Sequence, residues 1–122
     1  MNLFISFLLL FSLNSFAFED GEKAYEEALS GKAIIIDVRE KDELQDGMIK
    51  EAVSFPLSQL EAPSSQWLGE FKVLTKGKNI YLYCRSGKRA QKSLEILKKN
   101  GIESKNIGGW ETLKGKLPTT EK

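Results

Sequence analysis

The sequence contains no histidine and only one cysteine, and these two scarcities exclude many kinds of catalytic site. Without an imidazole, Cys–His catalysis, Ser–His–Asp catalysis and histidine-ligated zinc sites are excluded. One thiol cannot form an internal disulfide or a multi-thiolate metal site. The charges nearly cancel, with 18 Lys and Arg against 17 Asp and Glu in 122 residues, so net charge favours no class of partner. Any chemistry must rest on the thiol, carboxylates, cations, hydroxyls or backbone amides.

Residues 1–18 carry no charged side chain, unlike the rest of the chain. An apolar run there leads into the small residues Ser15 and Ala17, a pattern typical of a secretory signal peptide cut after Ala17. The run is short for a membrane span. We therefore predict a signal peptide at 1–17, one domain at 18–122, and a periplasmic or secreted protein without stable membrane association after cleavage. The usual Lys or Arg at the front is absent, so an uncleaved anchor and a misassigned start remain alternatives.

The rest of the chain alternates between apolar runs and amphipathic stretches. The apolar runs predict strands at 33–38, 52–56 and 80–84, and a shorter one near 103–109. The amphipathic stretches predict helices at 19–32, at 88–101 and, more briefly, at 110–116. Strands that alternate with helices imply right-handed crossovers and an α/β fold, a parallel sheet with helices on both faces. Ligands of such sheets bind beyond the carboxyl ends of the strands.

Cys84 ends the third long strand and begins the sequence Cys-Arg-Ser-Gly-Lys-Arg. Backbone N–H groups at the start of the following helix lack partners within the helix, and a curled loop would direct them at its centre. Gly87 permits the backbone angle that such a loop needs. These amides, with Arg85, Lys88 and Arg89, would stabilise a nucleophilic thiolate and bind an anionic substrate. The alternative is a structural cysteine beside exposed cations.

The charges are unevenly distributed along the chain. Residues 19–61 hold twelve acids and five bases, whereas residues 72–105 hold ten bases and two acids. Solvated helix faces would explain this asymmetry, and so would a half that attracts anions around the cysteine.

Three segments resemble the rhodanese sulfurtransferases. The cysteine loop after a buried strand resembles that family's active-site loop. Residues 34–60 are similar to its amino-terminal signature of Asp-Val-Arg, Glu, Gly-His-Ile, then Ala and a short strand before Pro, and Asn-Ile-Gly-Gly-Trp at 106–110 resembles its Gly-Gly-Trp segment. The segments occur in the family's order over nearly all of 18–122, as in its small, single-domain, exported bacterial members. Met48 stands where the family often has His, for which we expect altered packing without loss of chemistry.

The resemblance implies a thiosulfate:cyanide-type sulfurtransferase that moves sulfane sulfur through a persulfide on Cys84. The thiolate attacks the outer sulfur of a small anionic donor such as thiosulfate, sulfite leaves, and a thiophilic acceptor such as cyanide or a thiol takes the sulfur. The implied substrate-binding residues are Arg85, Ser86, Gly87, Lys88 and Arg89. Asp37 and Arg39 are implied as supporting residues that tie a strand end to neighbouring loops. No metal, organic cofactor or nucleic acid is expected.

Two other functions would use the same thiol. Cysteine phosphatases have an anion-binding loop with Arg as the sixth residue after the cysteine, but that position here is Ala90 and Arg89 comes one residue early. The other alternative is a sulfur carrier or sulfur-binding module that delivers the persulfide to a protein partner. Steady turnover with small acceptors would favour the enzyme, and a stable persulfide without turnover would favour the carrier.

Five more residues are interpreted individually. Glu43 either pairs with an arginine or is solvated. Trp67 is predicted to lie in the core, whereas Trp110 lies either in the core or at the mouth of the pocket. Gly108 and Gly109 are predicted to form a tight turn near the cysteine loop.

Overall fold

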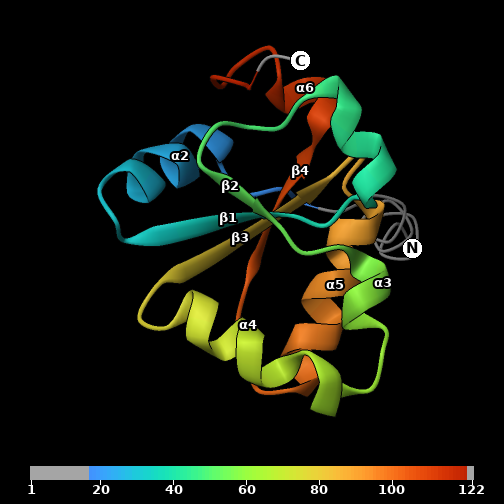
Figure 1. Cartoon of the computed structure of the whole chain (residues 1–122). Coiled ribbons are helices and arrows are strands. Elements are labelled where there is room, and N and C mark those ends of the chain that lie inside the picture. The colour runs from blue at the N-terminus through green and yellow to red at the C-terminus, as the bar shows by residue number, and fades with distance from the viewer. Residues whose placement is uncertain (1–16, 121–122) are drawn as a thin grey trace, which may run out of the picture.

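The computed structural model describes residues 17–120, so the predicted signal peptide at 1–17 lies outside the described residues except for Ala17. A four-stranded sheet crosses the domain in the order β2–β1–β3–β4 (Figure 1). The strands are β1 Ala33–Asp37, β2 Ala52–Ser54, β3 Asn79–Cys84 and β4 Lys105–Gly109. All neighbouring strands in it run parallel, which confirms the sheet expected from the alternation of strands and helices.

Helices cover both faces of the sheet, which confirms the predicted α/β class. One face carries α2 Gly21–Leu29 and α6 Trp110–Leu113, and the other carries α3 Leu57–Leu60, α4 Leu68–Thr75 and α5 Lys88–Lys99. Two 3₁₀ helices, η1 Lys41–Asp46 and η2 Ser64–Gln66, lie in the connections. Within residues 17–120, no helix combines the length and apolar character needed to cross a membrane.

β1 is buried along its whole length because it lies inside the sheet with helices on both sides. Successive strand residues point to opposite faces, so Ile34 and Ile36 pack with the α3–α5 face while Ile35 packs with the α2–α6 face. The uninterrupted β-branched run in the sequence is what such a strand requires.

The two tryptophans lie in different hydrophobic clusters. Trp67 is 1% exposed and packs edge-on against Phe71 with ring centroids 5.9 Å apart, so the core prediction is confirmed. Trp110 is 4% exposed and belongs to the cluster under α2 and α6. The structure therefore favours the core interpretation of Trp110 over the pocket-mouth interpretation.

Candidate active site

Cys84 is the last residue of β3 and is fully buried. Its Sγ atom accepts hydrogen bonds from the backbone N–H groups of Gly87, at 3.0 Å, and Ala90, at 3.3 Å. Both amides lie at the start of α5, where N–H groups lack partners within the helix. The structure thus contains the predicted amide cradle around the sulfur. Two N–H donors aimed at one sulfur suit a thiolate better than an apolar, space-filling cysteine.

The backbone of the loop between Cys84 and α5 is fixed by β4. Gly87 directly precedes α5 and has φ +98°. This is a left-handed backbone conformation that residues with a side chain rarely adopt. The side-chain amide of the buried Asn106 donates to the Gly87 carbonyl at 2.9 Å, and its oxygen accepts the N–H of Gly108 at 2.9 Å. The end of β4 therefore holds the turn that places the amides beneath the sulfur.

The prediction that Gly108 and Gly109 lie near the cysteine loop is confirmed, but the predicted tight turn is wrong, because both residues belong to the end of β4. Gly108 has φ +105°, and a Cβ atom at Gly109 would overlap the carbonyl oxygen of Arg85. Phe18 also lies against this region, since a Cβ atom at Gly87 would come within 2.5 Å of its ring. Small residues at these positions let the loop, β4 and the Phe18 ring pack together.

Asp37 and Arg39 form a fully buried ion pair at the end of β1. Arg39 Nη2 donates to Asp37 at 2.8 Å and to the Gly47 carbonyl at 2.7 Å, and its guanidinium lies 4.7 Å from the centre of the Trp110 ring. Burial alone would lower the pKa of Arg39, but the hydrogen bonds and charge of Asp37 hold it above its ordinary value. The pair ties the strand end to the next connection, as expected for supporting residues.

The two loop arginines are both paired with carboxylates. Arg89 contacts both oxygens of Glu43, with an Nη2–Oε2 distance of 2.8 Å. Arg85 contacts Glu43 at 3.2 Å, Asp46 at 3.2 Å and Glu111 at 3.0 Å. Hydrogen bonds from Arg89 are the main cause that lowers the pKa of Glu43 to about 2. Of the two interpretations of Glu43, the structure shows pairing with arginine.

Lys88 is the remaining cation of the loop. It is exposed and forms no ion pair among residues 17–120. Ser86 is also exposed. The structure therefore separates the predicted substrate-binding cations into two compensated guanidinium groups and one free ammonium group.

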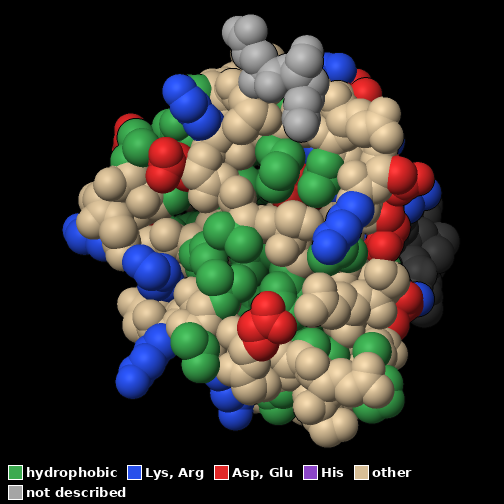
Figure 2. Space-filling view, in the orientation of Figure 1, with side chains coloured by type: hydrophobic (Ala, Val, Ile, Leu, Met, Phe, Trp, Pro, Cys, Tyr) green, Lys and Arg blue, Asp and Glu red, His purple; other side chains and the backbone are tan. Residues whose placement is uncertain are grey.

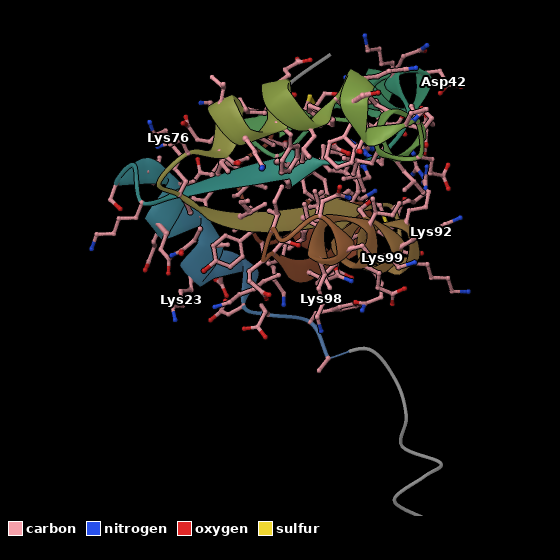
Figure 3. All side chains as sticks on the ribbon, turned by 90° about the horizontal axis from the view of Figure 1, so that it is seen from below. Lys23, Asp42, Lys76, Lys92, Lys98 and Lys99 are labelled. Atoms are coloured by element: carbon pink, nitrogen blue, oxygen red, sulfur yellow. The ribbon has the colours of Figure 1, made fainter. Side chains whose placement is uncertain are left out.

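The uneven charge of the sequence acquires a structural explanation at this site. The acids on η1 come from the acidic half of the chain, and the loop arginines come from the basic half. Figure 3 shows Asp42 of η1 and Lys92 of α5 at the end of the molecule toward which the strands point, with Lys76 at the opposite end. Acidic and basic side chains lie side by side along the right edge of Figure 2. Part of the charge asymmetry is therefore explained by ion pairs between the acids of η1 and the loop arginines. Other charged side chains lie on solvated helix faces.

A pocket of about 680 Å³ opens beside the loop, between the amino end of α2 and α6. Its lining includes Phe18, Arg85, Ser86, Gly108 and Glu111. Cys84 does not line this pocket, because its side chain lies on the α3–α5 side of the sheet. The pocket is thus adjacent to the cysteine loop without opening directly onto the sulfur.

Sequence reasoning missed four residues around the loop. Asn106 lies inside the recognised Asn-Ile-Gly-Gly-Trp segment, so its position offered a signal. Phe18, Asp46 and Glu111 offered none, because their contacts depend on how distant segments pack. At Met48, which stands where the resembling family often has His, the backbone N–H donates to the Thr120 hydroxyl at 2.9 Å.

Comparisons with known proteins agree with this geometry. The signature of the family described as "Rhodanese-like domain" matches residues 21–116. YqhL of Bacillus subtilis (strain 168) is 36% identical over 88 residues, which are 70% of this chain and 64% of that protein. A Schizosaccharomyces pombe (strain 972 / ATCC 24843) protein named putative mitochondrial thiosulfate sulfurtransferase is 34% identical over 84 residues, 63% of this chain and 57% of that protein.

The chain spans less than two thirds of the length of these two relatives. Among solved structures, the human single-domain sulfurtransferase is similar with a TM-score of 0.66 and 22% identity, over 84% of this chain and 98% of that chain. At this level of identity the likeness supports the fold.

Proposed function

The chain belongs to the rhodanese-like domain family. From this premise we propose that it is a sulfurtransferase that catalyses thiosulfate:cyanide-type sulfur transfer through a persulfide on Cys84, which the names of the relatives support. The observation that carries the proposal is the pair of backbone N–H groups directed at Cys84 Sγ. They stabilise negative charge on the thiolate before the reaction and on the persulfide after it.

The proposed reaction has two steps and needs no net oxidant or reductant. The Cys84 thiolate attacks the outer sulfur of thiosulfate, a Cys84 S–S bond forms, the donor S–S bond breaks, and sulfite leaves with the electron pair. Cyanide or a thiolate then attacks the outer sulfur of the persulfide, and the Cys84 thiolate leaves. Two covalent half-reactions of this kind predict ping-pong kinetics.

Carboxylates already compensate the two loop arginines, whereas Lys88 is exposed and forms no ion pair among residues 17–120. The pKa of Arg89 is raised, mainly by its hydrogen bonds to Glu43. We propose that Lys88, the exposed cation of the loop, contributes most to the attraction of an anionic donor.

We also propose export, with residues 1–17 as a cleaved signal peptide and a periplasmic or secreted location. The uncharged stretch and the small residues Ser15 and Ala17 support this proposal. Mass spectrometry of the exported protein would test it, since cleavage after Ala17 leaves Phe18 as the first residue.

The experiment that tests the catalytic proposal is intact-mass measurement before and after thiosulfate, followed by cyanide and a thiocyanate assay. We expect a gain of one sulfur atom, lost to cyanide with release of thiocyanate. Cys84→Ser keeps the size of the side chain and should lose the gain completely while its circular dichroism spectrum stays unchanged. Sulfur transfer by the serine variant would overturn the mechanism. A loaded cysteine with negligible turnover would support the sulfur carrier instead.

A further inference from the structure

Glu43 occupies both arginines that flank the buried thiol. It accepts hydrogen bonds from Arg89 through both carboxylate oxygens and from Arg85 at 3.2 Å. Its side chain is only 22% exposed. An anionic donor that approaches these guanidinium groups therefore meets a carboxylate that already occupies them.

We propose that Glu43 determines which donor charge the site accepts, and that it favours a singly charged sulfane-sulfur donor over doubly charged thiosulfate. The inference rests on the proposed sulfurtransferase function. Two opposing charges at contact distance cancel most of the field that either would exert on a third ion. With both guanidinium groups compensated, a second negative charge on the donor gains little attraction from the arginines and is repelled by Glu43.

The position of Glu43 distinguishes it from the other acids around the loop. Of the two loop arginines, Asp46 and Glu111 contact only Arg85, and Glu111 also pairs with Lys114 at 3.0 Å. The side chains of Asp46 and Glu111 are 60% and 57% exposed, so water and salt screen them strongly. Glu43 is fixed in place because its carboxylate also accepts the backbone N–H of Glu40 at 3.1 Å. Its pKa of about 2 keeps it charged at every pH near neutrality.

The chemistry is the same for either donor. The Cys84 thiolate attacks the sulfane sulfur, the donor S–S bond breaks, and the leaving group departs with the electron pair. Sulfite leaves from thiosulfate, and methanesulfinate leaves from methanethiosulfonate. The two donors share the reacting bond and differ by one negative charge, so the ratio of their kcat/KM values reports how the site responds to donor charge.

The test compares this ratio for the unmodified protein, Glu43→Gln and Glu61→Gln. Glutamine keeps the size and one acceptor oxygen of Glu43 but removes its charge. Glu61→Gln is the matched control. Glu61 also pairs with a cation of α5, the exposed Lys92, at 2.8 Å. We expect Glu43→Gln to raise the thiosulfate-to-methanethiosulfonate ratio about tenfold, which corresponds to about 1.4 kcal/mol, and Glu61→Gln to leave it unchanged. An unchanged ratio in Glu43→Gln would overturn the inference.

Two further outcomes separate the inference from the proposed function. If Cys84 gains sulfur from neither donor, the sulfurtransferase proposal fails, and the donor preference fails with it. If both donors load Cys84 and the ratio of kcat/KM values is the same in Glu43→Gln as in the unmodified protein, only the donor preference fails. Should Glu43→Gln not fold, the salt dependence of Lys88→Gln decides, because that variant removes the one loop cation that no carboxylate compensates among residues 17–120. We expect its kcat/KM for thiosulfate to change little between low and high salt. A steep fall with salt would show that the two arginines still attract the donor and would overturn the inference.

Discussion

At the scale of single residues, the buried pair of Asp37 and Arg39 shows how this domain supports the strand ends beside the cysteine loop. Both side chains are fully buried at the end of β1, beside the strand that ends in Cys84. A guanidinium group without water is tolerated only when its charge and its N–H groups find partners. Here Asp37 supplies the charge and the Gly47 carbonyl accepts a further hydrogen bond. The pair therefore acts as a structural support for the edge of the sheet that carries Cys84.

Removal of one partner should be far more damaging than removal of both. We expect Asp37→Leu to lower the free energy of unfolding by about 3–5 kcal/mol, because it leaves the Arg39 charge buried without compensation. The double variant Asp37→Leu, Arg39→Met should recover part of this loss, since no buried charge remains. Urea unfolding followed by circular dichroism measures both values. A double variant less stable than Asp37→Leu alone would contradict this account.

At the scale of elements, the contact between η1 and the start of α5 holds the loop from outside. Glu43 and Asp46 on η1 bind Arg85, and Glu43 also binds Arg89 in the first turn of α5. η1 follows β1, and α5 follows β3, which are neighbours in the sheet. The parallel arrangement therefore places the acidic connection and the basic loop at the same edge.

This contact should make stability depend on pH in the acid range. The pKa of Glu43 is lowered from 4.5 to about 2, first by hydrogen bonds from Arg89. A lowered pKa means that the unfolded chain binds the proton more readily, so Glu43 stabilises the fold fully above about pH 4.5. The stabilisation is lost as pH falls toward about 2. Thermal unfolding between these pH values should show a smaller decline in Tm for Glu43→Gln than for the unmodified protein. Equal declines would exclude Glu43 as a source of acid sensitivity.

The elements also show what the sequence predicts and what it does not. Continuous apolar runs identify β1 and β3 in the sequence, because strands buried on both faces need such runs. The end of the second run also places Cys84 correctly, at the last residue of β3. The partners of the loop arginines were predictable only in part. Pairing of Glu43 with an arginine was one of two interpretations, but local pattern could not choose between them because Glu43 is 42 residues from Arg85. The sequence also assigned Arg85 and Arg89 to anion binding. Only packing reveals that carboxylates already occupy them.

At the scale of the whole molecule, two hydrophobic clusters share the same two central strands. Leu82 of β3 packs with the α3–α5 cluster, whereas its neighbours Tyr81 and Tyr83 pack with the α2–α6 cluster. β1 divides its side chains in the same way. Loss of either cluster would expose side chains that hold the sheet itself, so neither layer of helices should be stable without the other.

The domain should therefore unfold in one cooperative step, and its two tryptophans allow each face to be observed separately. Trp67 reports on the α3–α5 cluster and Trp110 on the α2–α6 cluster. In Trp110→Phe, fluorescence comes from Trp67 alone, and Trp67→Phe gives the converse. Each substitution lowers stability somewhat, so the comparison is made within a variant, between fluorescence and far-ultraviolet circular dichroism during urea unfolding. Coincident transitions are expected in both variants, as for most single domains under about 150 residues. A fluorescence change that precedes the circular dichroism change in either variant would show that one helical layer separates first.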